Sequence, residues 1–145
     1  MCYTVFLSTT SAEALDELPS ALYKFVCTTE QDDRAIGDLL KYPHRWYLTG
    51  QYGGCSCHFR HDAEGNNSGF GIPEDWCPED ADNIESTGAV YDALTHIVAG
   101  GHSVDLVDIW NGAGPEGIRD LSVSLHDVPR DAFRFFENVR FVLSV

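Results

Sequence analysis

The sequence is poor in cations. Its 145 residues include 9 Lys and Arg together against 23 Asp and Glu, which gives a formal net charge of −14 at pH 7. No Lys or Arg occurs between Arg60 and Arg119, an interval that holds twelve acidic residues. Because like charges repel, nucleic acids and anionic membrane surfaces are disfavoured as partners.

Long apolar runs are also absent. Nowhere do eighteen apolar residues follow one another, so no membrane-spanning helix is expected. The apolar patch near the N-terminus has no basic segment before it, and acidic residues follow it, which indicates a first strand rather than a signal peptide. The five cysteines are an odd number that does not suit a closed disulfide framework. We therefore expect reduced thiols and a cytoplasmic location.

The common catalytic and nucleotide-binding signatures are missing as well. The sequence has no phosphate-binding lysine loop and no GxGxxG, GxSxG or HExxH pattern. Asp62, Glu64 and Asn66 alternate like the start of an EF-hand loop, but Asn67 and Pro73 stand where that loop needs Gly and Glu. A non-catalytic protein is therefore favoured, and a small enzyme with an unfamiliar site is the lowest-ranked alternative.

What the sequence does contain is the composition of one globular domain. Hydrophobic residues make up 43% of the chain and aromatic residues 12%, and 145 residues are enough for a core of its own. The spacing of apolar residues predicts a single α+β domain over 1–145, with a mainly antiparallel sheet of about six or seven strands and about four helices. The expected strands are 2–8, 22–28, 45–51, 55–60, 102–110, 121–126 and 139–145. The expected helices follow a Thr10 cap, cover 33–41, run from an Asp82 cap to about residue 98, and follow Pro129.

Aromatic residues, thiols and imidazoles gather in residues 44–61. Two strand-like runs, 45–51 and 55–60, flank Gly53-Gly54, which predicts a β-hairpin because glycine reaches the positive φ of a tight turn. Thiols and imidazoles are also zinc ligands. The candidate metal ligands are Cys55, Cys57, His58, His61 and Cys77.

The geometry of a regular strand works against such a zinc site. Residues on one face of a strand are about 6.8 Å apart, too far for several of them to bind one ion. A bulge or kink is therefore needed to bring Cys57, His58 and Cys77 together. Without it, Cys55 and Cys57 are small buried hydrophobic residues, as free cysteines commonly are. No cofactor other than zinc is indicated.

Asp105 and Asp108 interrupt an otherwise apolar strand. On the two-residue period of a strand, Asp108 shares a face with Val104 and Leu106. Its carboxylate is then partly buried, which requires hydrogen-bond donors or a raised pKa. Two roles are open for it: polar recognition at the mouth of a pocket, or capping of a nearby loop. The enzyme alternative would place a cleft near Asp108, His58 and the long loop 62–77.

The long loop 62–77 carries an aromatic residue among acids. Trp76 lies close to Glu74, Asp75 and Glu79, and Trp is frequent at binding hot spots. We therefore interpret the protein as a small acidic binding or regulatory domain, of the inhibitor or immunity type, that recognises a cationic protein partner through these four residues. The alternative is a solvated acidic face that only keeps the protein soluble. The oligomeric state stays open.

Overall fold

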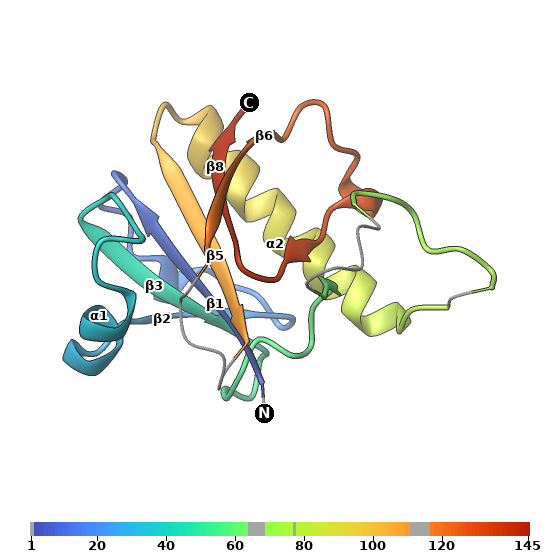
Figure 1. Ribbon diagram of the computed structural model, residues 1–145, viewed down its shortest axis with the longest axis horizontal. Coiled ribbons are helices and arrows are strands. Elements are labelled where there is room, and N and C mark those ends of the chain that lie inside the picture. Colours follow the sequence, from blue (N-terminus) through green and yellow to red (C-terminus); the bar gives the residue numbers. More distant parts are fainter. Residues whose placement is uncertain (1, 64–68, 77, 111–116) are drawn as a thin grey trace.

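A computed structural model describes residues 2–63, 69–76, 78–110 and 117–145 (Figure 1). Its strands are β1 (Tyr3–Thr9), β2 (Lys24–Cys27), β3 (His44–Thr49), β4 (His61–Asp62), β5 (Val104–Trp110), β6 (Arg119–Ser124), β7 (Phe135–Phe136) and β8 (Val139–Ser144), and its helices are α1 (Glu30–Ile36) and α2 (Ala81–Ala99). Six strands form one sheet in the order β2-β3-β1-β5-β8-β6. Neighbours in it run antiparallel except β6 and β8, which are parallel. The short strands β4 and β7 pair in parallel beside it.

Each face of the large sheet packs against one helix. The larger core lies on the α2 side, where Leu94 is fully buried, and the smaller core lies on the α1 side with Ile36. Leu7 and Phe6 are neighbours on β1, yet they belong to the larger and the smaller core respectively. This alternation is the two-residue period of a strand that is covered on both sides. A single α+β domain, predicted from the composition and the periodicity, is thus consistent with the structure.

Two of the four expected helices are single 3-10 turns in the described residues. At the first, the Thr10 hydroxyl accepts the N–H of Ser103 (2.9 Å) instead of capping a helix, and only Leu15–Glu17 turns. This hydrogen bond from the chain that enters β5 occupies the Thr10 hydroxyl oxygen, which a helix N-cap would need as an acceptor. At the second, Arg130–Ala132 turns once, because the extended chain beyond it buries Phe133 in the core.

The other two expected helices are present with shifted starts. Thr29 and Asp32 form a capping box that begins α1 three residues earlier than predicted. The cap of α2 is Asp80 rather than Asp82, and its carboxylate accepts the Asp82 N–H (2.8 Å). Within the described residues, neither helix has the length and apolar character that crossing a bilayer requires.

The predicted hairpin is wrong. β3 lies between β2 and β1, so both of its edges are hydrogen-bonded and residues 55–60 cannot pair with it. These residues form turns instead, after Gly53 and Gly54 with φ of 82° and 90°. Ser56 attaches the turns to the sheet: its N–H donates to the Tyr3 carbonyl (2.9 Å), and its hydroxyl oxygen accepts the N–H of Val5 on β1 (2.9 Å).

A buried ion pair joins three strands of the sheet. Arg140 on β8 donates two hydrogen bonds to one carboxylate oxygen of Asp105 on β5 (2.6 and 2.9 Å) and one to Asp120 on β6 (3.0 Å). The Lys41 N–H and the Ser8 hydroxyl also donate to the Asp105 carboxylate. Asp105 is fully buried. The guanidinium therefore compensates a carboxylate that water does not reach.

Replacement of Arg140 by Ala should lower the free energy of unfolding by about 3–5 kcal/mol, because the Asp105 carboxylate would stay buried without its charge partner. Urea unfolding followed by circular dichroism measures this loss. The control is Arg34→Ala, since Arg34 pairs with Glu30 on the exposed side of α1 and such pairs contribute only about 0.3–0.5 kcal/mol. Equal losses in the two variants would contradict the prediction.

Candidate functional site

Residues 50–62 run from the end of β3 to β4, and cavities open along them. In the described part of the chain, three such cavities have volumes of about 380, 380 and 410 Å³. The segment contributes lining residues to all three: Gly50 and His58 to the first, Cys57 and His61 to the second, and Gly54 and Cys55 to the third. The segment thus presents most of the Cys and His side chains that the sequence indicated.

Three thiols converge at the start of this segment. The sulfur atoms of Cys2, Cys55 and Cys57 all lie within 4.8 Å of one another, and all three residues are half-buried. The Tyr3 N–H donates to Cys57 Sγ (3.3 Å). The structure therefore brings together two predicted metal ligands and adds Cys2, which the sequence reasoning missed.

The shared hydrogen bonds make these thiols unequal. Burial acts to raise the pKa of Cys55, but hydrogen bonds with Cys57 and Cys2 outweigh it and lower the pKa. Burial raises the pKa of Cys57 to about 12, and its hydrogen bond with Cys55 adds to the rise. Cys55 therefore loses its proton before Cys57 does.

The other predicted metal ligands do not join the cluster. His58 lines the cavity beside α2, and His61 bonds to the carboxylate of Asp108. Cys77 lies outside the described residues. His58 lines a different cavity from the three thiols, whereas His61 lines the second cavity together with Cys57.

His61 and Asp108 form a buried pair. Nδ1 of His61 lies 2.6 Å from Asp108 Oδ2, and Nε2 lies 2.6 Å from the carbonyl oxygen of Ser56. A carbonyl oxygen can only accept, so Nε2 carries a hydrogen and a further proton is shared between Nδ1 and Oδ2. Burial raises the pKa of Asp108, while the hydrogen bond with His61 opposes that rise. Tyr3 stacks on the imidazole at a centroid distance of 4.1 Å.

This pair confirms the burial predicted for Asp108 and gives it a partner that the sequence did not reveal. Both ring nitrogens of His61 are hydrogen-bonded within the fold, so neither serves as a free base in this arrangement. Asp108 and His58 also do not line a common cavity among the three described above. The geometry is that of a structural hydrogen bond between β4 and β5.

The predicted partner-binding residues divide into two groups. Trp76 is 80% exposed, its indole N–H donates to Glu74, and Asp75 beside them is also exposed. Glu79 instead accepts two hydrogen bonds from Arg60 (2.7 and 2.9 Å) and a third from Arg134 (3.3 Å). The hydrogen bond from Arg60 is the main cause of a lowered pKa of Glu79. Glu79 therefore holds the base of the loop through Arg60 and Arg134.

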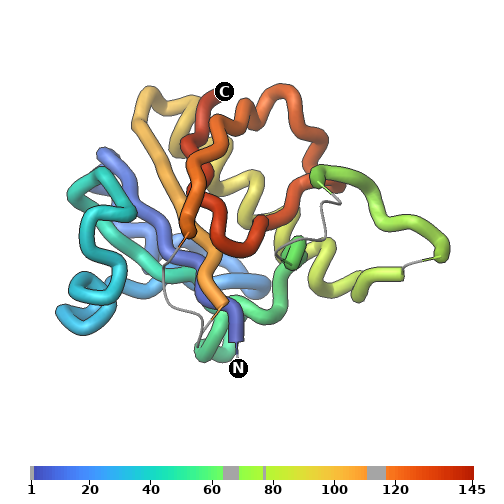
Figure 2. Tube along the Cα trace, viewed as in Figure 1, coloured from blue at the N-terminus to red at the C-terminus, as the bar shows by residue number. Residues whose placement is uncertain are grey.

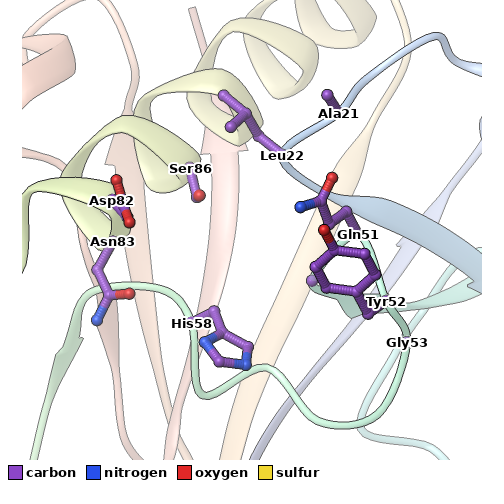
Figure 3. Close-up of a pocket in the computed structure, with 10 residues that line it drawn as sticks. Ala21, Leu22, Gln51, Tyr52, Gly53, His58, Asp82, Asn83 and Ser86 are labelled. Atoms are coloured by element: carbon purple, nitrogen blue, oxygen red, sulfur yellow. The ribbon is translucent and has the colours of Figure 1, made fainter.

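The first cavity has a polar wall on α2 (Figure 3). Asp82, Asn83 and Ser86 line that wall, while Tyr52 lies on the opposite side and His58 lies between them. Tyr52 is 93% exposed, so it forms part of the rim rather than a closed wall. The described residues that line the cavity offer several hydrogen-bonding groups. Asp82 is the one acidic residue among them, and so the one that could pair with His58 by charge.

Comparison with family models, with curated proteins and with solved structures finds no match.

The phenol of Tyr3 should make stability depend on pH in alkaline solution. Burial, followed by the charges of Glu137 and Asp108, raises the pKa of Tyr3 to about 12. The folded protein then keeps a proton that the unfolded chain releases near pH 10, so this contribution is complete below pH 10 and is lost as the pH rises towards 12. Unfolding free energies measured across this range should fall less steeply for Tyr3→Phe than for the unaltered protein. Identical slopes would contradict the prediction.

Proposed function

We propose that the protein is a non-catalytic binding domain that recognises a cationic protein partner through its acidic loop. This name refers to the exposed residues Ile72, Glu74, Asp75 and Trp76. In Figures 1 and 2 this part of the chain extends away from the sheet and from α2. Tryptophan is enriched at binding hot spots, and an indole exposed among carboxylates suits a partner with an apolar pocket in a basic surface.

The distribution of negative charge is the observation that carries the proposal. Of the twelve acids between Arg60 and Arg119, Glu64 and Glu116 lie outside the described residues, and several others are used within the fold. Three are buried and two are paired with arginines: Asp62, Asp105 and Asp108, then Glu79 and Asp92. The remaining exposed acids all lie in or just after the acidic loop: Glu74, Asp75, Asp80, Asp82 and Glu85.

The base of the acidic loop is held in place by arginines. The carbonyl oxygen of Gly71 accepts hydrogen bonds from Arg60 (2.7 Å) and Arg134 (2.8 Å). Glu79, at the other end of the loop, forms ion pairs with the same two guanidinium groups. A loop that is anchored before binding loses less conformational entropy when it binds. Charge complementarity would then speed the encounter with a basic surface.

A variant with Glu74→Lys, Asp75→Lys and Trp76→Ala should lose its partner, because it removes the apolar anchor and reverses two charges. Affinity capture from an extract of the cells that make the protein should yield a basic protein with the unaltered chain and not with this variant. With the purified partner, the variant should associate about tenfold more slowly or worse, and added salt should slow the association of the unaltered protein.

The matched control reverses two exposed acids elsewhere, Asp16→Lys and Glu17→Lys, together with Tyr52→Ala at an exposed aromatic residue. This control should capture the partner as well as the unaltered chain does. If both variants captured it equally, or if the captured protein were acidic and bound independently of salt, the proposal would be wrong.

A further inference from the structure

We propose that Cys2, Cys55 and Cys57 form a three-thiolate site for a soft divalent metal ion of the zinc type. This inference is independent of the acidic loop and of any protein partner. It places a metal ligand, Cys2, at a position that no motif in the sequence marks. The thiols are contributed by two parts of the chain that are 53 residues apart and that the sheet holds side by side.

The sulfur atoms are already close to a coordination geometry. They lie within 4.8 Å of one another. Three thiolates with bonds of about 2.3 Å to one zinc ion would be about 3.8–4.0 Å apart, so each pair needs to approach by about 1 Å at most. Side-chain rotations of this size require no movement of the sheet. A disulfide would use only two of the three thiols, whereas one ion uses all of them.

The backbone around the thiols is fixed before any ion binds. Cys2 directly precedes β1, which lies inside the sheet between β3 and β5. Ser56, between the other two cysteines, bonds to Tyr3 and to Val5 on β1, and its hydroxyl donates to the Leu48 carbonyl on β3 (2.5 Å). The Tyr3 N–H that donates to Cys57 Sγ holds that sulfur beside β1.

The site is open to solvent and has room for a fourth ligand. None of the three cysteines is fully buried, which distinguishes them from cysteines that only fill a core. Cys2 and Cys55 line the cavity of about 410 Å³. Among the described residues, no fourth Cys, His, Asp or Glu lies within 4.8 Å of all three sulfurs. Water or an external thiol would complete a tetrahedral zinc site on the cavity side.

Charge favours a divalent ion over a monovalent one. Three thiolates add three negative charges to a chain with a net charge of −14, and Asp32 also lines the adjacent cavity. A divalent ion offsets two of these charges, whereas a monovalent copper ion offsets one. Each ligating thiol that was protonated gives its proton to the buffer, so binding should weaken as the pH is lowered.

Alkylation of the unaltered, reduced chain tests the site without any substitution. Iodoacetamide modification should be followed at each cysteine by mass spectrometry, with and without one equivalent of Zn²⁺. Zinc should slow modification of Cys2, Cys55 and Cys57 by about tenfold or more, because a coordinated sulfur is no longer a free nucleophile. Cys27 is exposed on β2 and serves as the internal control, whose rate should not change. Equal effects at all four thiols, or none, would overturn the proposal.

Titration with Co²⁺ then reports the number of thiolates. The unaltered protein should bind one ion with an intense sulfur-to-cobalt charge-transfer band, and Cys2→Ser, Cys55→Ser and Cys57→Ser should each lose about a third of its intensity, or all of it. Cys27→Ser should keep the full band. Binding without this band would assign the ion to carboxylates and overturn the site. A disulfide between two of the three cysteines in protein isolated without oxygen would also overturn it.

Discussion

The buried guanidinium of Arg60 connects the parts of the molecule on which its surface depends. It pairs with both carboxylate oxygens of Glu79 and donates to the carbonyl oxygens of Gly71, Asp131 and Phe133. A planar group with five donors can satisfy several carbonyls that would otherwise be buried without partners. One side chain thereby fixes the end of residues 50–62, the base of the acidic loop and the chain that enters β7.

The position of β3 inside the sheet determines the path of the chain that follows it. With both edges of β3 occupied, the chain that follows cannot form a hairpin and turns back towards β1 through Ser56. That turn brings Cys55 and Cys57 beside Cys2 and leads to His61, which bonds to the buried carboxylate of Asp108. The proposed metal site and the structural His–Asp pair are both products of one topological constraint.

The cost of burying a carboxylate explains why two of the buried acidic residues have charged partners. Burying a carboxylate costs free energy unless it is paired or protonated, and two of the buried aspartates have an arginine or a histidine beside them. Asp105 has Arg140, and Asp108 has His61. Among the described acids between Arg60 and Arg119, those that remain exposed and are not paired with an arginine lie in the acidic loop or in and just before the first turns of α2.

The sequence by itself determined the class of the domain, most of its strands, the long helix and the burial of Asp108, because these follow from the local period of apolar residues around positions such as Val104 and Leu106. It also located Trp76 and the acids beside it. Only the tertiary structure decided which strands are neighbours, that Glu79 is paired with Arg60, and that Cys2 lies beside Cys55 and Cys57. These are contacts between residues far apart in the chain, and no local periodicity encodes which distant edges meet.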